Sequence, residues 1–341
     1  KQDRPMNSTL AIRKLRQRRY NLIWITVFFL LLTGSIAALY YAAAQIDYVW
    51  RWYRIPRYFY YQEDVEIKAE QNGEVAAVTL QGDTVSITVK GDGEEKTYTA
   101  PTRNATVSEG DLIFVGDTLA SYKAWKVGIR MMGLWITIKV SVISILFGIL
   151  IGILTGLARI SANPALKWSA ITYIELIRGS PLLVQIFIWY FVLGTLVNTL
   201  LVKQGVGITV PPLWFGVAAL AFFTGAYVAE IVRAGIQSIH RGQTEAARSL
   251  GMSYVQTMTH VILPQAMRRI LPPLAGQFIS LIKDSSLLGI IAIRELSKAT
   301  REVVTTSLQP FELWFMCALL YLILTFSLSM CVQYLERRTL A

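Results

Sequence analysis

The chain has 341 residues, of which 54% are hydrophobic and 16% charged, and its formal net charge is +11. Soluble globular proteins carry about 25% charged residues, so this composition excludes an ordinary soluble domain. The basic residues recur beside apolar runs instead of forming one stripe, which argues against a nucleic-acid-binding surface. Several apolar runs of about 20 residues are long enough to cross a bilayer as helices. The sequence therefore predicts an α-helical integral membrane protein.

The first apolar run, Leu22–Ala44, follows a strongly basic leader. A signal peptide has the same order, and Ala42–Ala44 resembles a cleavage site, but an h-region spans only about 7–15 residues. We expect a retained helix, so that residues 1–45 form a cytoplasmic leader and the first span. The basic residues of the leader are Arg13, Lys14, Arg16, Arg18 and Arg19.

Residues 46–126 have a different composition. Their beginning, DYVWRWYRIPRYFYY, mixes aromatic and arginine residues as in a membrane-interface belt. Alternating runs such as DTVSITVK, bounded by glycines, predict strands and hence a small β domain outside the cytoplasm. The segment VSEGDLIFVGDTL resembles the closing strands of a biotinyl/lipoyl-type barrel sandwich, without a modifiable lysine at the matching tip. A generic β domain accounts for it equally well.

The segment GDGEEKT within this region imitates a phosphate-binding loop. Such a loop needs glycine directly before the lysine, so that backbone amides surround the phosphate. Here Glu95 precedes Lys96, and Glu94 adds a second repelling charge. We interpret the segment as a hairpin turn and expect no nucleotide site.

No residues suggest catalysis, a cofactor or a metal. His240 and His260 lack cysteine or carboxylate partners at metal-ligand spacing. Cys317 and Cys331 both fall in the last apolar run, where neither a structural disulfide nor a zinc site is expected.

Residues 127–341 contain five further apolar runs and are expected to form the membrane domain. Six crossings place both termini on one side, and the positive-inside rule makes that side the cytoplasm. The basic residues on that side include the leader, Arg159, Lys167, Arg337 and Arg338. The expected further spans are Met131–Leu157, Trp168–Leu200, Leu213–Ile236, Leu271–Ile293 and Phe311–Tyr334.

Glycines and charges inside these spans carry two further predictions. Gly148, Gly152 and Gly156 recur every fourth residue, which favours close packing of another helix on that face. Charges inside a membrane are costly unless they are paired or hydrated. Glu230 with Arg233, and Glu175 with Arg178, have the i, i+3 spacing of ion pairs within the bundle.

Lys283, Asp284, Ser285 and Ser286 lie together halfway along another expected span. Charges and hydroxyls at this depth suggest a polar translocation path. The alternative is that Lys283 and Asp284 only brace neighbouring helices.

Residues 237–270 form a polar cytoplasmic segment between two spans. Glu245-Ala246-Ala247 favours a helix, and Ala247 and Gly251 are expected to leave a shallow surface on one of its faces. Gly251 weakens the helix, and Pro264, Pro272 and Pro273 limit where the next one begins. These traits predict a short helix presented to a soluble partner.

The spacing EAA, three residues, Gly251, nine residues, then Val261-Ile-Leu263-Pro264 resembles the EAA motif of ATP-binding-cassette (ABC) importer permeases. YIELIRGSPLLVQIFIWYF, GAYVAEIVRAGIQSIHRGQTEAARSLGMS and LIKDSSLLGIIAIREL resemble its polar amino acid branch (histidine, glutamate, glutamine or arginine). The resemblance covers roughly the last 215 residues. The N-terminal helix and the β domain lie outside it.

The resemblance implies a five-helix type I importer permease core and ATP-driven alternating access for polar amino acids. Its partners would be a dimer of cytosolic ATPase subunits, a second permease (identical or homologous) and an extracytoplasmic binding protein. ATP would be hydrolysed by the separate ATPase, which receives the helix bearing Glu245, Ala246, Ala247 and Gly251. The location would be the bacterial inner membrane.

Two other functions fit part of the sequence. A sensor or scaffold whose β domain binds a ligand would explain that domain but leave the EAA spacing unexplained. The second alternative function is an ion channel lined by the same polar residues. Dependence of uptake on ATP and a binding protein would separate an importer from both.

Overall fold

The computed structural model describes residues 6–91 and 93–340, with the surroundings of side chains given for 17–91 and 93–334. By its contacts the chain divides into two compact units, residues 1–52 and 53–341. Within the described part, six helices are long and apolar enough to cross a membrane. Some basic side chains used for the predicted orientation lie outside the described residues, namely those of Arg13, Lys14, Arg16, Arg337 and Arg338.

The first unit is mainly one uninterrupted helix, α1 (Met6–Gln45). Its large apolar side chains, among them Phe28 and Leu31, are exposed. Such a surface suits surrounding lipid. After the helix, the rings of Trp50 and Trp52 stack in parallel with centroids 5.8 Å apart.

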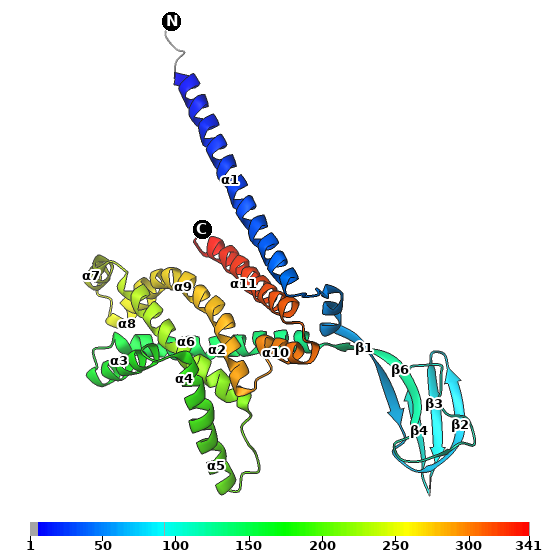
Figure 1. Cartoon of the computed structure of the whole chain (residues 1–341). Helices are drawn as coiled ribbons and strands as arrows, with labels where there is room; N and C mark the ends of the chain where they lie inside the picture. The colour runs from blue at the N-terminus through cyan, green and yellow to red at the C-terminus, as the bar shows by residue number, and fades with distance from the viewer. Residues whose placement is uncertain (1–5, 92, 341) are drawn as a thin grey trace. The chain divides into compact units, whose positions relative to one another are not determined.

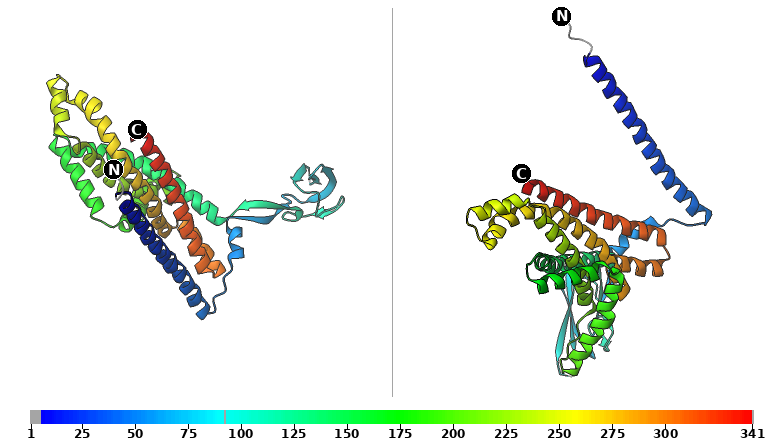
Figure 2. Two further views of the ribbon diagram at one scale, coloured as in Figure 1. Left: turned by 90° about the horizontal axis from the view of Figure 1, so that it is seen from above. Right: turned by 90° about the vertical axis from the view of Figure 1, so that its left-hand side faces the viewer.

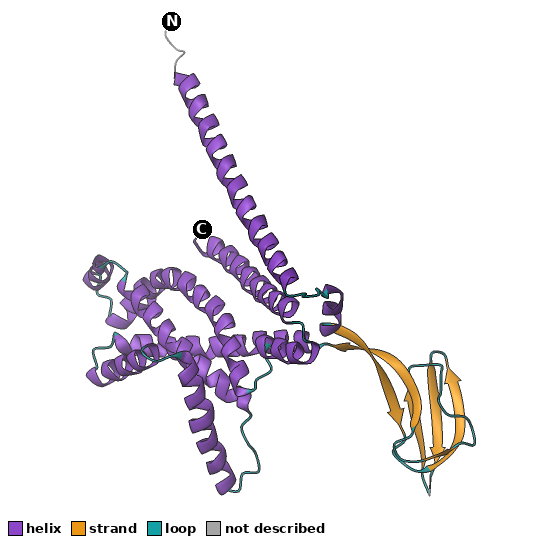
Figure 3. Cartoon of the chain, in the orientation of Figure 1, coloured by secondary structure: helices purple, strands orange, loops and turns teal. Residues whose placement is uncertain are grey.

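The β region opens the second unit (Figure 3). Antiparallel β1 (Tyr60–Lys68) and β6 (Thr118–Val127) form a two-stranded ribbon. The other strands form a sheet in the order β4-β3-β2-β5. Alternating side chains from Val85 to Val89 are buried in its core, as the period-two pattern predicts. These strands are β2 (Gly73–Gln81), β3 (Thr84–Lys90), β4 (Glu95–Ala100) and β5 (Leu112–Ile113).

The hairpin interpretation of GDGEEKT is confirmed. β3 and β4 pair Lys90 with Glu95, and the amide of Gly91 donates to the carbonyl of Glu94 at 3.1 Å. Gly93 has a φ of +122°, a backbone conformation that glycine adopts readily.

The short helix η1 (Trp52–Tyr58) precedes the β region in the chain and packs against the helical part. Its Ile55 is buried with Val303 and Leu313. The helical part follows in chain order (Figure 1). Its elements are α2 (Ile129–Arg159), α3 (Pro164–Arg178), α4 (Leu182–Phe187), the π-helical η2 (Ile188–Gly194), α5 (Thr195–Lys203), α6 (Pro212–Gln237), α7 (Arg241–Ser249), α8 (Tyr254–Thr257), the π-helical η3 (Met258–Ile262), α9 (Leu263–Asp284), the 3-10 helix η4 (Ser285–Ile291), α10 (Leu296–Ser307) and α11 (Pro310–Leu340).

Close packing on the glycine face is confirmed, and the neighbour is α6. A Cβ atom built on Gly152 would lie 2.4 Å from Val228, and one on Gly148 would lie 3.0 Å from Thr224. Only residues without a side chain permit this approach. On the other side of the bundle, α9 lies beside α11 in both views of Figure 2.

Two predicted spans are wrong in their limits. Trp168–Leu200 is not one helix, because α3 ends at Arg178 and α4 begins at Leu182. Pro181 lacks an amide hydrogen and disfavours helical geometry in the residue before it, so the chain breaks there. The span predicted at Leu271–Ile293 belongs to a longer helical stretch, Tyr254–Ile291.

Candidate functional site: the coupling segment and the charged positions of the bundle

The predicted coupling segment folds as the short helix α7 followed by a tight turn. The Nδ1 atom of His240 accepts a hydrogen bond from the amide of Gly242 at 3.1 Å and caps the helix start. At the other end, the amide of Gly251 donates to the carbonyl of Arg248 at 2.9 Å. Gly251 has a φ of +80°, the left-handed conformation in which glycine ends helices. The glycine of the motif therefore makes a backbone turn.

The structure contradicts the expectation that Ala247 and Gly251 share an open helix face. Ala247 is 4% exposed, and Gly251 lies beyond the last helical residue. Glu245 and Ala246 are exposed. Leu250, directly after the helix and not among the predicted coupling residues, is 82% exposed. The signal for it was a single large apolar residue in a polar segment.

The chain re-enters a helix much earlier than predicted. Ser253 accepts from the amide of Gln256 at 3.3 Å, and the Gln256 side chain accepts from the Ser253 amide at 2.9 Å. This capping box starts α8, and the helix runs on through η3 into α9. Pro264 is exposed in the first turn of α9, which follows the π-helical η3. Pro272 and Pro273 lie inside α9, which curves in Figure 1.

Glu230 of α6 is the centre of a cluster of arginines from three helices. Arg233, one turn further along α6, donates to its Oε2 atom from Nη2 at 2.9 Å and from Nε at 3.1 Å. Arg159, the last residue of α2, donates to its Oε1 atom. Arg178, the last residue of α3, lies 4.0 Å away. One carboxylate thus joins the ends of α2 and α3 to α6.

The predicted pair of Glu175 with Arg178 is not formed in the described structure. Glu175 is exposed, and the guanidinium of Arg178 lies over the ring of Tyr227 at 5.3 Å and close to Glu230 instead. The i, i+3 spacing allowed the pair, but a partly buried carboxylate on α6 competes for the arginine. Arg159 was missed, because nothing in its local sequence points to Glu230, 71 positions away.

The four polar residues proposed for the substrate path have different surroundings in the structure. Ser285 is fully buried, and its hydroxyl donates to the carbonyl of Ile282 at 2.7 Å. Lys283 is exposed and Asp284 half-buried. Lys283 and Ser286 line a cavity of about 320 Å³ with Ser297, Trp314, Cys317, Ala318 and Tyr321. Ser285 is therefore removed as a direct substrate contact, whereas Lys283 and Ser286 remain candidates.

Glu295, which the sequence analysis did not select, supports the wall of this cavity. It is 1% exposed and accepts hydrogen bonds from the amides of Ser297 and Lys298, both at 2.7 Å, so it caps α10. The hydroxyl of Tyr321 donates to it at 2.9 Å. Burial raises the pKa of the Glu295 carboxyl, while these hydrogen bonds oppose the shift.

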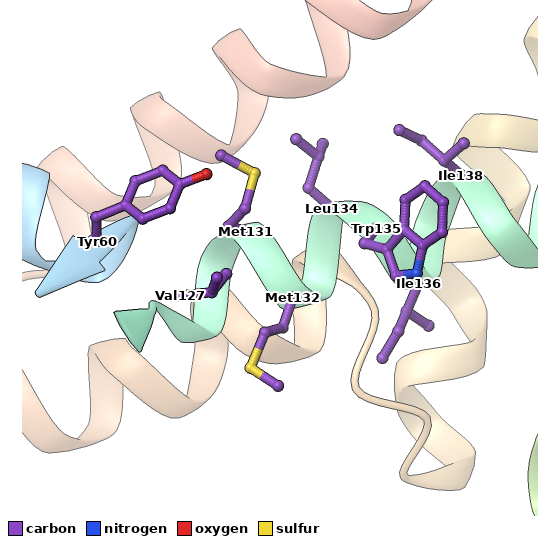
Figure 4. Close-up of a pocket in the computed structure, with 8 residues that line it drawn as sticks. All are labelled: Tyr60, Val127, Met131, Met132, Leu134, Trp135, Ile136 and Ile138. Carbon is purple, nitrogen blue, oxygen red and sulfur yellow. The ribbon is translucent and has the colours of Figure 1, made fainter. Parts of the chain in front are cut away.

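An apolar groove of about 510 Å³ lies where the β region meets α2 (Figure 4). Tyr60 and Val127 come from the two strands of the ribbon, and Met131 and Trp135 from the first turns of α2. Its lining is almost entirely apolar and offers no charged group to a polar substrate. Across the described residues, no three histidine, cysteine or acidic side chains gather as a metal site would require.

Residues 148–341 match the protein family described as "Binding-protein-dependent transport system inner membrane component". The chain is 39% identical over 208 residues to the probable glutamine ABC transporter permease protein GlnM of Bacillus subtilis, covering 61% of this chain and 92% of that protein. It is 38% identical over 207 residues to the L-cystine transport system permease protein TcyB of the same organism, covering 60% and 84%.

Two solved structures of ABC transporters are also similar to this chain. A crystal structure of an amino acid ABC transporter with histidines matches with a TM-score of 0.54 and 36% identity, over 62% of this chain and 94% of that one. The inward-facing MetNI methionine ABC transporter matches with a TM-score of 0.51 and 20% identity, over 62% and 96%, which concerns the fold alone.

Proposed function

Since the chain belongs to the family of binding-protein-dependent transport inner membrane components, we propose that it is the permease subunit of an ABC importer for a polar amino acid. The relatives named as glutamine and cystine permeases carry this proposal, because the chain aligns with nearly their whole length. The subunit is non-catalytic, and a separate ATPase subunit hydrolyses ATP. It is a multi-pass protein of the inner membrane.

The coupling residues are Glu245, Ala246, Ala247, Gly251 and Pro264. Ala247 is buried in α7, which packs against α8 and η3, and Gly251 turns the chain after the exposed Leu250. Pro264 lies in the first turn of α9, which carries movement of this segment towards the cavity at Lys283. A groove on the ATPase that receives α7 would thus be linked to the bundle through α9.

The cavity at Lys283 and Ser286 is the proposed part of the substrate path. An amino acid that leaves water loses the hydration of its ammonium and carboxylate groups, and the path must replace it. Lys283 supplies a cation and Ser286 a hydroxyl, while the hydroxyls of Ser297 and Tyr321, which bond each other, belong to the wall that Glu295 supports. Asp284 lies next to Lys283 in sequence but is not among the cavity residues, so we assign it a bracing role.

Alternating access would result when ATP binding favours one of two arrangements of the bundle. We propose a pair of permease subunits, identical or homologous, with a dimer of ATPase subunits in the cytoplasm and a binding protein outside. Both termini and α7 would then be cytoplasmic, and the β region extracytoplasmic.

Uptake by the reconstituted complex tests this function. Proteoliposomes with this chain and its ATPase should accumulate radiolabelled glutamine only with internal ATP and external binding protein. Labelled cystine, glutamate and arginine would identify the substrate among polar amino acids. Uptake without ATP would indicate a channel, and no uptake of any amino acid by an assembled complex would contradict the importer.

A further inference from the structure

A groove of about 460 Å³ opens beside the Glu230 cluster, between the end of α6 and α9. Three arginines line it, Arg178, Arg233 and Arg269, against the single carboxylate of Glu230. Neither the importer function nor the proposed substrate path makes use of this excess of positive charge.

The arginines are only partly occupied by protein partners. Glu230 is bound by Arg233 and by Arg159, which lies outside the lining of the groove. Arg178 is 4.0 Å from the carboxylate, beyond hydrogen-bond distance, and its side chain is 42% exposed. Arg269 donates from Nη1 to the carbonyl of Ser238 at 2.5 Å. A guanidinium has five N–H donors, so both Arg178 and Arg269 retain donors for an anion.

Apart from Ser238, the rest of the lining is apolar, and the groove lies at the edge of a membrane span. Ile231, Ala234 and Pro273 form part of the wall. The span containing α6 ends at Gln237, four residues after Arg233, so the groove is expected near the depth where lipid head groups meet the hydrocarbon core. Basic pockets between helices at this depth bind anionic lipid head groups.

We propose that this groove binds the phosphate of an anionic phospholipid, with Arg178 and Arg269 donating to its oxygens and the apolar wall contacting the glycerol and first acyl carbons. Planar guanidinium groups match phosphate oxygens in pairs. The inference extends the proposed function, because a lipid at this site would hold α3, α6 and α9 together near the coupling segment. It concerns binding alone and does not depend on which amino acid is carried.

Thermal unfolding of the purified complex in detergent, with added lipid, tests the site. Phosphatidylglycerol should stabilise the wild-type complex, while zwitterionic phosphatidylethanolamine should not. Arg178→Gln and Arg269→Gln should each weaken the phosphatidylglycerol response by about fivefold in concentration, the effect of about 1 kcal/mol per arginine. Arg268→Gln is the matched control, because Arg268 neighbours Arg269 on α9 and does not line the groove.

Tests with other ligands distinguish a lipid phosphate from a soluble anion. If inorganic phosphate reproduces the stabilisation, and the two groove variants lose it, the site holds as a phosphate site but the ligand is soluble. An equal phosphatidylglycerol response in all three variants would overturn the proposal. So would stabilisation by a free amino acid that requires Arg178 and Arg269, since the groove would then bind substrate. Uptake is measured separately, so failure of this site leaves the importer function intact, and the reverse also holds.

Discussion

At the scale of single residues, neighbouring positions of the EAA segment have different structural roles. Gly251 allows a left-handed turn, Ala247 packs inward, and Glu245 faces solvent. A bulky residue at Gly251 would strain the backbone by about 1–2 kcal/mol and would therefore not test docking alone. Leu250 is the better probe, because it is exposed and its backbone is unstrained.

We expect Leu250→Asp to uncouple transport from ATP hydrolysis. A charge would replace an apolar side chain that docking buries, at a cost of about 2 kcal/mol, or roughly thirtyfold in ATPase affinity. Co-purification of the ATPase and ATP-driven uptake measure the effect. Leu112→Asp is the control, since Leu112 of β5 is 76% exposed, has no positive φ and is remote from α7 in sequence. Unchanged ATPase binding in Leu250→Asp would remove this residue from the docking surface.

A second prediction at this scale compares two adjacent serines. Ser286→Ala removes a hydroxyl from the cavity and should raise the substrate concentration for half-maximal uptake about fivefold, the effect of about 1 kcal/mol for one hydrogen bond. Ser285→Ala removes a buried hydroxyl that bonds its own helix and should alter stability but not that concentration. The reverse result would show that the path lies elsewhere.

At the scale of elements, packing between α2 and α6 depends on residues that carry no side chain. Gly148, Gly152 and Gly156 each place α2 against side chains or carbonyls of α6. The Glu230 cluster then joins the ends of α2 and α3 to the same helix. Close packing along the length of α2 and α6, and ion pairs at the ends of α2 and α3, hold these helices together.

We expect Gly152→Ala to destabilise the complex by about 1–3 kcal/mol, because the added methyl overlaps Val228 at a fixed backbone separation. The midpoint of thermal unfolding in detergent measures this. Gly276→Ala makes the same chemical change in α9, where no atom lies within 4 Å of the new Cβ, and should be neutral or mildly stabilising. Equal stability of the two variants would show that α2 moves away from α6 at little cost.

At the scale of the whole molecule, the orientation in the membrane decides whether α7 can meet a cytosolic ATPase. The charge bias predicts that α7 is cytoplasmic and that the β region lies outside the cytoplasm. Two positions report on these sides, Ser253 at the start of α8 and Glu94 in the β3–β4 turn, and both are exposed. Glu94 is preferred to Gly93, whose positive φ would be strained by any side chain.

In cells, a cysteine at Glu94 should react with an impermeant thiol reagent from outside, and one at Ser253 should not. The background needs Cys317→Ala and Cys331→Ser, since both native cysteines are free. Permeabilised cells, in which both positions should react, are the control. If only Ser253→Cys is labelled in intact cells, the orientation is the opposite of the predicted one, and α7 lies on the side of the membrane that lacks ATP.

Hydropathy, period-two alternation and motif spacing are local properties of the chain, so the sequence alone predicts the membrane class, the β region, the family and the six long apolar helices found among the described residues. It could not place Arg178 and Arg159 on Glu230, since ion pairing between helices depends on how the helices pack. Nor could it separate Ser285 from Ser286, because which of two adjacent residues enters the core is decided by neighbouring elements. Tertiary structure likewise turned Gly251 from a helix-face residue into a turn, since the left-handed φ becomes visible only in the folded backbone.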